Sequence, residues 1–195
     1  GLTLSSPVIA SAEDDAAGDL RPAAMPALIS ADWSKLPPGG FLKRYDQLMM
    51  AAANESGQGS EGTPPPHAAR MALARFMVGQ GLAFEAIGIL NSAARVDQTL
   101  MGDAEFRGLR GAARVMAGRY KEAESDFSVP ILSSDPASAL WRGYIAARAG
   151  RWEDARARFA DGQQAMAYVP SLWAARFAKA NAEAVWKAKD VEFNV

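Results

Sequence analysis

The residue types that most often carry catalysis or metal binding are sparse in this chain. Its 195 residues include no cysteine and a single histidine, His67, which has no carboxylate three or four positions later to share a metal ion. Adjacent acids occur as Asp14-Asp15 and Glu153-Asp154, and the second pair falls in an expected first helical turn, where negative charge favours the helix dipole. No nucleophile-elbow, zinc-protease or dinucleotide-binding motif occurs. The sequence therefore predicts no catalytic residue, no metal site and no cofactor.

Charge and hydropathy narrow the class of partner. There are 21 basic and 22 acidic residues, a net charge of −1, so nothing favours nucleic acid or an anionic membrane surface. No apolar run approaches the roughly 20 residues that span a bilayer. We therefore expect a protein or peptide partner, without direct membrane insertion. The chain begins at Gly1 without a methionine or a leader, which suggests a fragment of a longer protein.

The first 40 residues predict an extended arm or linker. They show no sustained helical or strand period, and a Gly-Gly pair closes them. Prolines recur too often for a long helix, at Pro7, Pro22, Pro26, Pro37 and Pro38.

From residue 41 the apolar spacing becomes helical. A first helix over 40–54 is followed by a Gly- and Pro-rich linker, and residues 41–195 form the main domain. Glycines and N-terminal prolines then divide the chain into helices in pairs, with a lone helix at the end. We expect these at 67–79 with 83–95, 103–117 with 120–132, 136–149 with 152–167, and alone at 170–189.

Two of these pairs carry the same sequence pattern at a fixed offset of 32 residues, which is typical of stacked supersecondary units. The matched positions are Gly111 with Gly143, Gly118 with Gly150, Tyr120 with Trp152, Ala123 with Ala155, and Phe127 with Phe159. The first pair follows the pattern more loosely, with Gly81 over Gly118.

The segments Gly-Arg-Tyr-Lys-Glu-Ala-Glu-Ser-Asp-Phe and Gly-Arg-Trp-Glu-Asp-Ala-Arg-Ala-Arg-Phe resemble the centre of a tetratricopeptide repeat (TPR). The resemblance implies an all-α, TPR-like helix-turn-helix solenoid with a right-handed superhelix. Its repeats would cover about 67–98, 103–135 and 136–169, before the terminal helix 170–189. The chain departs from the family in its shorter period, in Arg107 and Ala139 where a large apolar residue is usual, and in Pro130, which should shorten or kink its helix.

The resemblance also implies a concave groove that binds a peptide or a partner protein. Positions that face this groove in the family carry an apolar floor, four cations and one acid. Such a groove favours a segment with acids beside apolar anchors, although the same arginines could be solvated or paired with neighbouring acids. The residues are Met71, Arg75, Glu105, Met116, Leu140, Tyr144, Arg148, Leu172, Arg176 and Lys179.

Three alternatives to an external partner remain open. Residues 8–20 combine four acids with apolar side chains, so this arm could dock on the groove of its own chain or of another protomer. The chain could instead be a self-assembling subunit of a bacterial envelope complex, through Trp173, Phe177 and Val185 of the last helix. It could also be a regulatory domain of a catalytic module outside this fragment. The order of its segments is similar to the repeat part of large bacterial proteins, which implies the periplasm or envelope rather than the cytoplasm.

Overall fold

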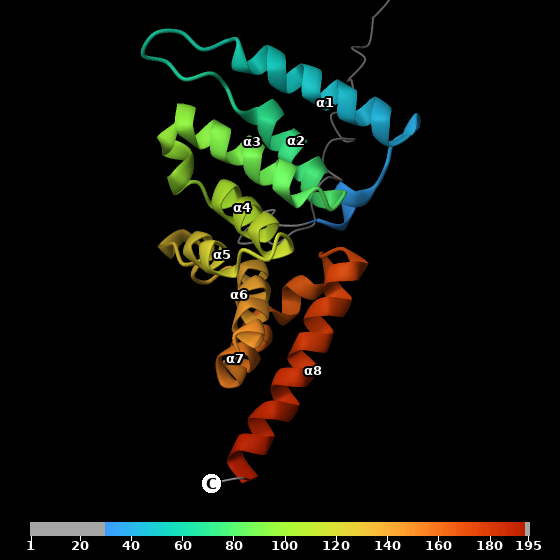
Figure 1. Cartoon of the computed structure of the whole chain (residues 1–195), viewed down its shortest axis with the longest axis vertical. Coiled ribbons are helices and arrows are strands. Elements are labelled where there is room, and N and C mark those ends of the chain that lie inside the picture. The colour runs from blue at the N-terminus through green and yellow to red at the C-terminus, as the bar shows by residue number, and fades with distance from the viewer. Residues whose placement is uncertain (1–29, 194–195) are drawn as a thin grey trace, which may run out of the picture.

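The computed structural model describes residues 30–193, and this part of the chain is all-α, with eight α-helices, four short 3-10 helices and no β-strand. The helices follow one another down the long axis of the molecule (Figure 1). Their bounds are Gly40–Ser56 (α1), Ala68–Gly79 (α2), Ala83–Val96 (α3), Ala104–Met116 (α4), Tyr120–Phe127 (α5), Pro136–Arg148 (α6), Trp152–Gly162 (α7) and Ser171–Phe193 (α8). The predicted arm falls largely on residues 1–29, outside the described range.

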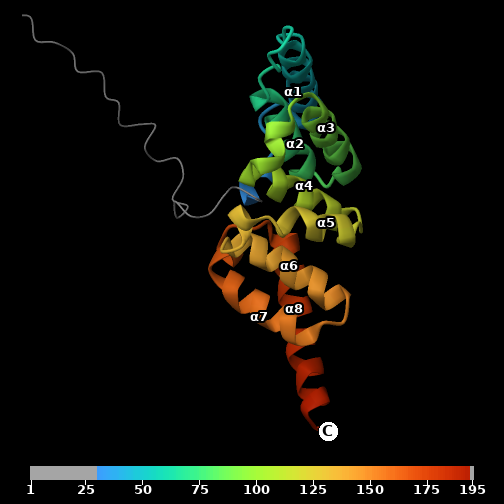
Figure 2. The ribbon, with the colours of Figure 1, turned by 90° about the vertical axis from the view of Figure 1, so that its left-hand side faces the viewer.

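Consecutive helices pack as pairs: α2 with α3, α4 with α5, and α6 with α7. Helix α1 covers α2, where the ring of Phe41 stacks on Phe76 with 5.4 Å between centroids. Helix α8 packs against both α6 and α7, and its C-terminal end extends beyond them, as the turned view shows (Figure 2). Before α1, a 3-10 helix over Ala31–Ser34 (η1) packs on α2.

The same turn joins the two helices of each pair. Each turn holds a glycine in the left-handed region, with φ of 77°, 74° and 73°, where a side chain would be strained. The backbone N–H after each glycine donates to the carbonyl five residues earlier, as in a Schellman cap, at 2.8, 2.8 and 2.9 Å. The glycines are Gly81, Gly118 and Gly150, and the bonds run from Leu82 to Met77, Arg119 to Arg114, and Arg151 to Ala146. The expected breaks are thus confirmed in all three pairs.

Inside the two matched pairs, a glycine of the first helix faces an aromatic ring of the second. A Cβ on Gly111 would lie 2.7 Å from Phe127, and one on Gly143 would lie 3.1 Å from Phe159. Both rings are buried, as are the alanines at the same crossings, Ala123 and Ala155. The glycine therefore allows the two helices of each matched pair to approach closely.

The core consists of two apolar clusters. One centres on α2, α3 and α4, with Leu73, Leu90 and Phe106 completely buried. The other centres on α6 and α8, where the buried Trp141 contacts three aromatic rings. Trp33 of η1 and Met116 of α4 contact both clusters, so the two are joined.

Several predicted helix bounds were wrong. The helix expected over 120–132 ends at Phe127, because Val129 precedes Pro130 and is held extended, and a short 3-10 helix over Pro130–Leu132 follows. The helix expected over 152–167 ends at Gly162 and continues as a 3-10 helix over Gln163–Ala167. Helix α1 runs two residues further than expected, to Ser56, and α8 runs on to Phe193.

Candidate functional site

The ten residues expected in the groove do not form one exposed surface. Met71 and Leu140 are buried in the two core clusters, because each faces a neighbouring helix rather than solvent. Met116 is half-buried where those clusters meet. Arg75 and Glu105 pair with each other, Nε to Oε1 at 2.5 Å, so their charges cancel locally. These five residues therefore offer little free chemistry to a ligand.

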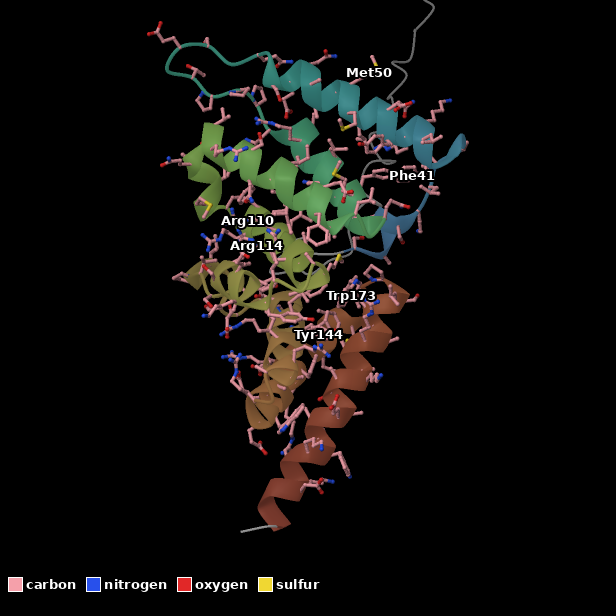
Figure 3. The ribbon with its side chains drawn as sticks, viewed as in Figure 1. Phe41, Met50, Arg110, Arg114, Tyr144 and Trp173 are labelled. Atoms are coloured by element: carbon pink, nitrogen blue, oxygen red, sulfur yellow. The ribbon has the colours of Figure 1, made fainter. Side chains whose placement is uncertain are left out.

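The other five expected residues lie on α6 and α8, close to where these helices pack. Figure 3 shows Tyr144 of α6 beside Trp173 of α8. We call the surface built around this contact the aromatic–arginine face. Its members are Tyr120, Tyr144, Arg148, Trp173 and Arg176, with Leu172 and Lys179 alongside on α8.

Tyr144 occupies the centre of the aromatic–arginine face. Its half-buried ring meets Trp173 edge to face, with 5.5 Å between centroids, and lies 6.4 Å from the ring of Tyr120. A third contact, to the buried Phe177 at 6.1 Å, continues the aromatic packing into the core. The centre of this face is therefore rigid, because its rings are held by the core beneath them.

Two arginines flank this centre. The guanidinium of Arg148 lies over the ring of Tyr120 at 5.9 Å, and that of Arg176 lies over Trp173 at 4.6 Å. Both side chains are exposed, and within residues 30–193 neither forms an ion pair with an acid. Stacking orients a guanidinium while leaving its N–H donors available for a carboxylate.

The electrostatics of Tyr144 place both arginines near its hydroxyl. Burial raises the pKa of this hydroxyl above its usual value, and the neighbouring Tyr120 raises it further. The positive charges of Arg148 and Arg176 act in the opposite direction on the same pKa. Both cations are therefore within electrostatic reach of one point, which is the arrangement needed to attract an anionic group between them.

Sequence reasoning missed a second charged cluster, between α4 and α5. Asp126 is completely buried and accepts from Arg110 Nη2 at 2.8 Å and from Arg114 Nη1 at 2.6 Å. Arg107 Nε lies 2.8 Å from Asp126 Oδ1, although it is not aligned for a hydrogen bond. Arg107 replaces the apolar residue usual in the repeat because its guanidinium reaches this carboxylate and donates to the Ser125 carbonyl. The available sequence signal was the spacing of Arg107, Arg110 and Arg114, which places these three arginines on one face of α4.

The arginines of this cluster have few donors left for a ligand. Arg107 also donates to the Met101 carbonyl, and Arg110 donates to the amide oxygen of Asn91. Their side chains are 11 and 8 % exposed. The cluster therefore holds α4 against α5 rather than presenting a binding surface.

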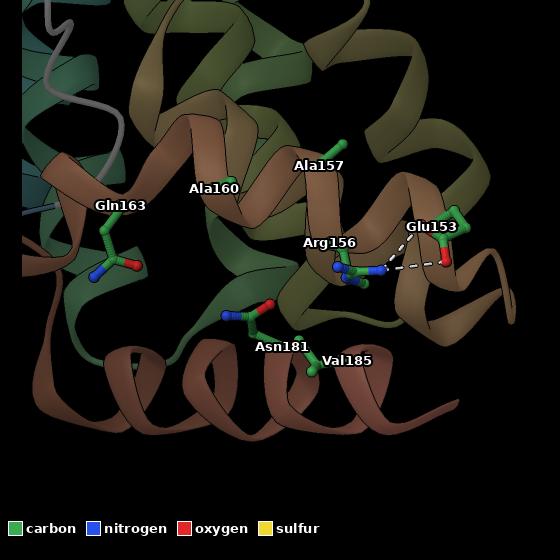
Figure 4. A pocket seen from close by; sticks show the side chains of 7 residues that line it. All are labelled: Glu153, Arg156, Ala157, Ala160, Gln163, Asn181 and Val185. Atoms are coloured by element: carbon green, nitrogen blue, oxygen red, sulfur yellow. Dashed lines mark hydrogen bonds and ion pairs between the residues drawn. The ribbon is translucent and has the colours of Figure 1, made fainter. Parts of the chain in front are cut away.

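An open hollow of about 660 Å³ lies between α7 and α8, on a different part of the surface (Figure 4). Among its lining residues the two charged ones, Glu153 and Arg156, pair with each other at 3.3 Å. The rest are small or amide side chains: Ala157, Ala160, Gln163, Asn181 and Val185. This lining offers no unpaired charge to orient a ligand.

Two further properties concern residues 30–193 as a whole. No group of three or more acidic or histidine side chains gathers there as metal ligands would. None of the helices in this range is long and apolar enough to cross a bilayer.

The residues expected to support self-assembly are placed differently from the prediction. Trp173 and Phe177 are 6 % and 0 % exposed, because α8 turns them onto α6, and Val185 is half-buried. Among residues 171–190 of α8, the exposed large apolar side chains are Leu172 and Trp186. Trp173 and Phe177 therefore do not form the exposed surface that was expected of the last helix, whereas self-assembly itself stays a prediction.

Comparison with protein-family models, with curated proteins and with solved structures finds no match to this chain.

Proposed function

We propose that the chain is a TPR-like helical repeat that acts as a non-catalytic scaffold, binding an acidic segment of a partner protein on the aromatic–arginine face. The repeat assignment is supported by the same glycine cap at three turns and by the same glycine–phenylalanine contact in two pairs. An α-solenoid arrangement of these pairs is part of the proposal.

One observation carries the binding proposal: Arg148 and Arg176 are exposed and oriented by aromatic rings, yet neither has an acidic partner in the described chain. By contrast, three other arginines near the molecular surface, Arg151, Arg156 and Arg158, are each paired with an acid. A carboxylate between the two arginines would receive charge-assisted hydrogen bonds from both, and the exposed Leu172 would contact an apolar neighbour in the ligand.

The proposal is tested with the full chain and a labelled probe peptide in which glutamates alternate with leucines. Fluorescence anisotropy should detect binding, and the peptide with glutamine in place of glutamate should bind at least tenfold more weakly, since a hydrogen bond to a charged group contributes about 1.5–3 kcal/mol. Arg148→Gln and Arg176→Gln should each cost about tenfold for the same reason.

Arg156→Gln is the matched control, because Arg156 is also a helix-surface arginine but is already paired with Glu153. It should leave the affinity unchanged. Equal loss in all three variants, or equal binding of the glutamate and glutamine peptides, would remove the basis of the proposal.

A further inference from the structure

The segment before α1 is attached at two distant places. The N–H of Ala31 donates to the carbonyl of Tyr168, just before α8, at 3.0 Å. The side-chain amide of Gln80, at the end of α2, donates to the carbonyl of Ser34 at 3.1 Å. Between them Trp33 packs on Gly79 so closely that a Cβ there would collide with the Trp33 carbonyl. We call residues 30–35 the strap.

The strap brings the start of the described chain to the aromatic–arginine face. Tyr168 lies three residues before Ser171, the first residue of α8, and Trp173 and Arg176 follow within the next two turns. Ser30, where the described chain begins, therefore lies next to the start of α8, which carries Trp173 and Arg176 of this face. An extended chain covers about 3.3 Å per residue, so the ten residues before Ser30 reach about 33 Å, whereas Ser171 to Lys179 of α8 spans only about 12 Å.

The sequence that precedes the strap matches the face in charge. Residues 8–20 lie outside the described range and read Val-Ile-Ala-Ser-Ala-Glu-Asp-Asp-Ala-Ala-Gly-Asp-Leu, with four acids between apolar ends. On the aromatic–arginine face, Arg148, Arg176 and Lys179 form no ion pair with an acid of residues 30–193. A short tether gives such a segment an effective concentration of about 1 mM at the face.

We infer that residues 8–20 are an intramolecular ligand of the aromatic–arginine face, so that an external acidic partner must displace them. This rests on the proposed function, since it assigns an occupant to the same face. The acids would meet Arg148 and Arg176, and an apolar end would contact Leu172. The consequence is autoinhibition: the face is closed by its own chain until a tighter acidic segment competes.

The absence of cysteine from the chain allows one label at a chosen position. A nitroxide on Ala16→Cys, placed among the acids of the full-length protein, should broaden the NMR signals of Trp173 Nε1–H and of the Tyr144, Arg148 and Arg176 amides. A label on Glu61→Cys, in the loop between α1 and α2, is the control and should leave those signals sharp.

Charge reversal then tests the contact itself. Arg148→Glu with Arg176→Glu should relieve the broadening, whereas Arg156→Glu should not. Replacing Glu13, Asp14 and Asp15 with lysine in the reversed protein should restore it. Broadening at other surfaces, no broadening at all, or broadening unaffected by charge reversal would overturn the inference.

Two further measurements separate the possible failures. Isotope-labelled chains without nitroxide can be mixed with unlabelled chains that carry it. Broadening in this mixture would mean that the segment docks on a second copy, which contradicts an intramolecular ligand. Neutralising the four acids should lower the Kd of the glutamate–leucine probe about tenfold. This factor follows because the local concentration of the tethered segment, about 1 mM, is about ten times a Kd of about 0.1 mM for its own docking. If the probe binds through Arg148 and Arg176 but its affinity is unchanged, the proposed function stands and the autoinhibition is refuted.

Discussion

The change Asp126→Asn tests the buried arginine cluster most directly. Asparagine keeps the size of the side chain but removes the charge that faces Arg107, Arg110 and Arg114. The guanidinium side chains are 8–13 % exposed, so water cannot readily take the place of the carboxylate. Removing one partner of a buried ion pair costs about 3–5 kcal/mol, and we expect the free energy of unfolding to fall by that amount.

The magnitude follows from the balance of charge. With Asp126, the exposed Glu122 at 3.7 Å from Arg114, and three arginines, the cluster carries an excess of one positive charge, and Asp126→Asn raises it to two. Arg114→Gln removes the excess and leaves Asp126 paired with the other two arginines. We therefore expect Arg114→Gln to cost clearly less than Asp126→Asn, because lost hydrogen bonds are partly offset by reduced repulsion.

Urea unfolding followed by tryptophan fluorescence and far-ultraviolet circular dichroism measures both variants. Glu153→Gln, which breaks an exposed pair with Arg156, is the control and should change the stability by less than about 1 kcal/mol. A loss of less than about 1 kcal/mol for Asp126→Asn, or a larger loss for Arg114→Gln, would refute the reasoning.

The remaining predictions concern pH and helix packing. Burial raises the pKa of Asp135, the N-cap of α6, from 3.8 to about 6, against the backbone N–H groups that lower it. The folded state then binds the proton more tightly, so this carboxyl adds roughly 3 kcal/mol to the free energy of unfolding below about pH 4, and this contribution is lost as pH rises through 6. Asp135→Asn keeps the cap acceptor and should remove this decline when urea unfolding is measured as a function of pH. An unchanged decline in the variant would contradict the assignment to Asp135. Gly111→Ala should destabilise the chain by about 1–3 kcal/mol because the new Cβ would lie 2.7 Å from Phe127. Gly88→Ala should instead stabilise it by about 0.5–1 kcal/mol, because no atom lies within 4 Å of the new Cβ and alanine favours a helix over glycine. Thermal unfolding checks the pair, and equal shifts would show that packing at Gly111 is not tight.

The all-α class and the divisions between paired helices were predictable because their signals are local. Gly118 and Gly150 end helices through their own backbone freedom, and Phe127 and Phe159 occupy the same place in each unit. The early end of α5 could not be read as firmly, because Pro130 permits either a kink or a stop until tertiary packing decides.

Long-range contacts were beyond the sequence. Glu55, at the end of α1, accepts from the Ala69 and Arg70 backbone N–H groups and so caps α2, although a flexible linker separates the two helices. No local pattern marks this contact, because both partners are ordinary surface residue types. The burial of Asp126 is hidden in the same way, since an acid late in a short helix usually faces water.

Candidate site residues were predictable only by face. A family position assigned Met71 and Leu140 to a groove, but both side chains are buried among neighbouring helices. Arg148 and Arg176 kept their exposure because guanidinium groups resist burial without a partner. The stacking of Arg148 on Tyr120 depends on how α6 meets α5, which no single helix encodes, whereas Arg176 and Trp173 lie three residues apart on α8.

The strap has a consequence for how the molecule unfolds. Helix pairs that contact only their neighbours can unfold one at a time from either end, and their folding needs few contacts between distant residues. Ala31 is bound to Tyr168 across most of the described chain, and Trp33 contacts both apolar clusters. The strap can therefore form only after both halves are folded, and once formed it couples them, so loss of the Trp33 contacts should weaken the coupling between the two halves, which Met116 also joins.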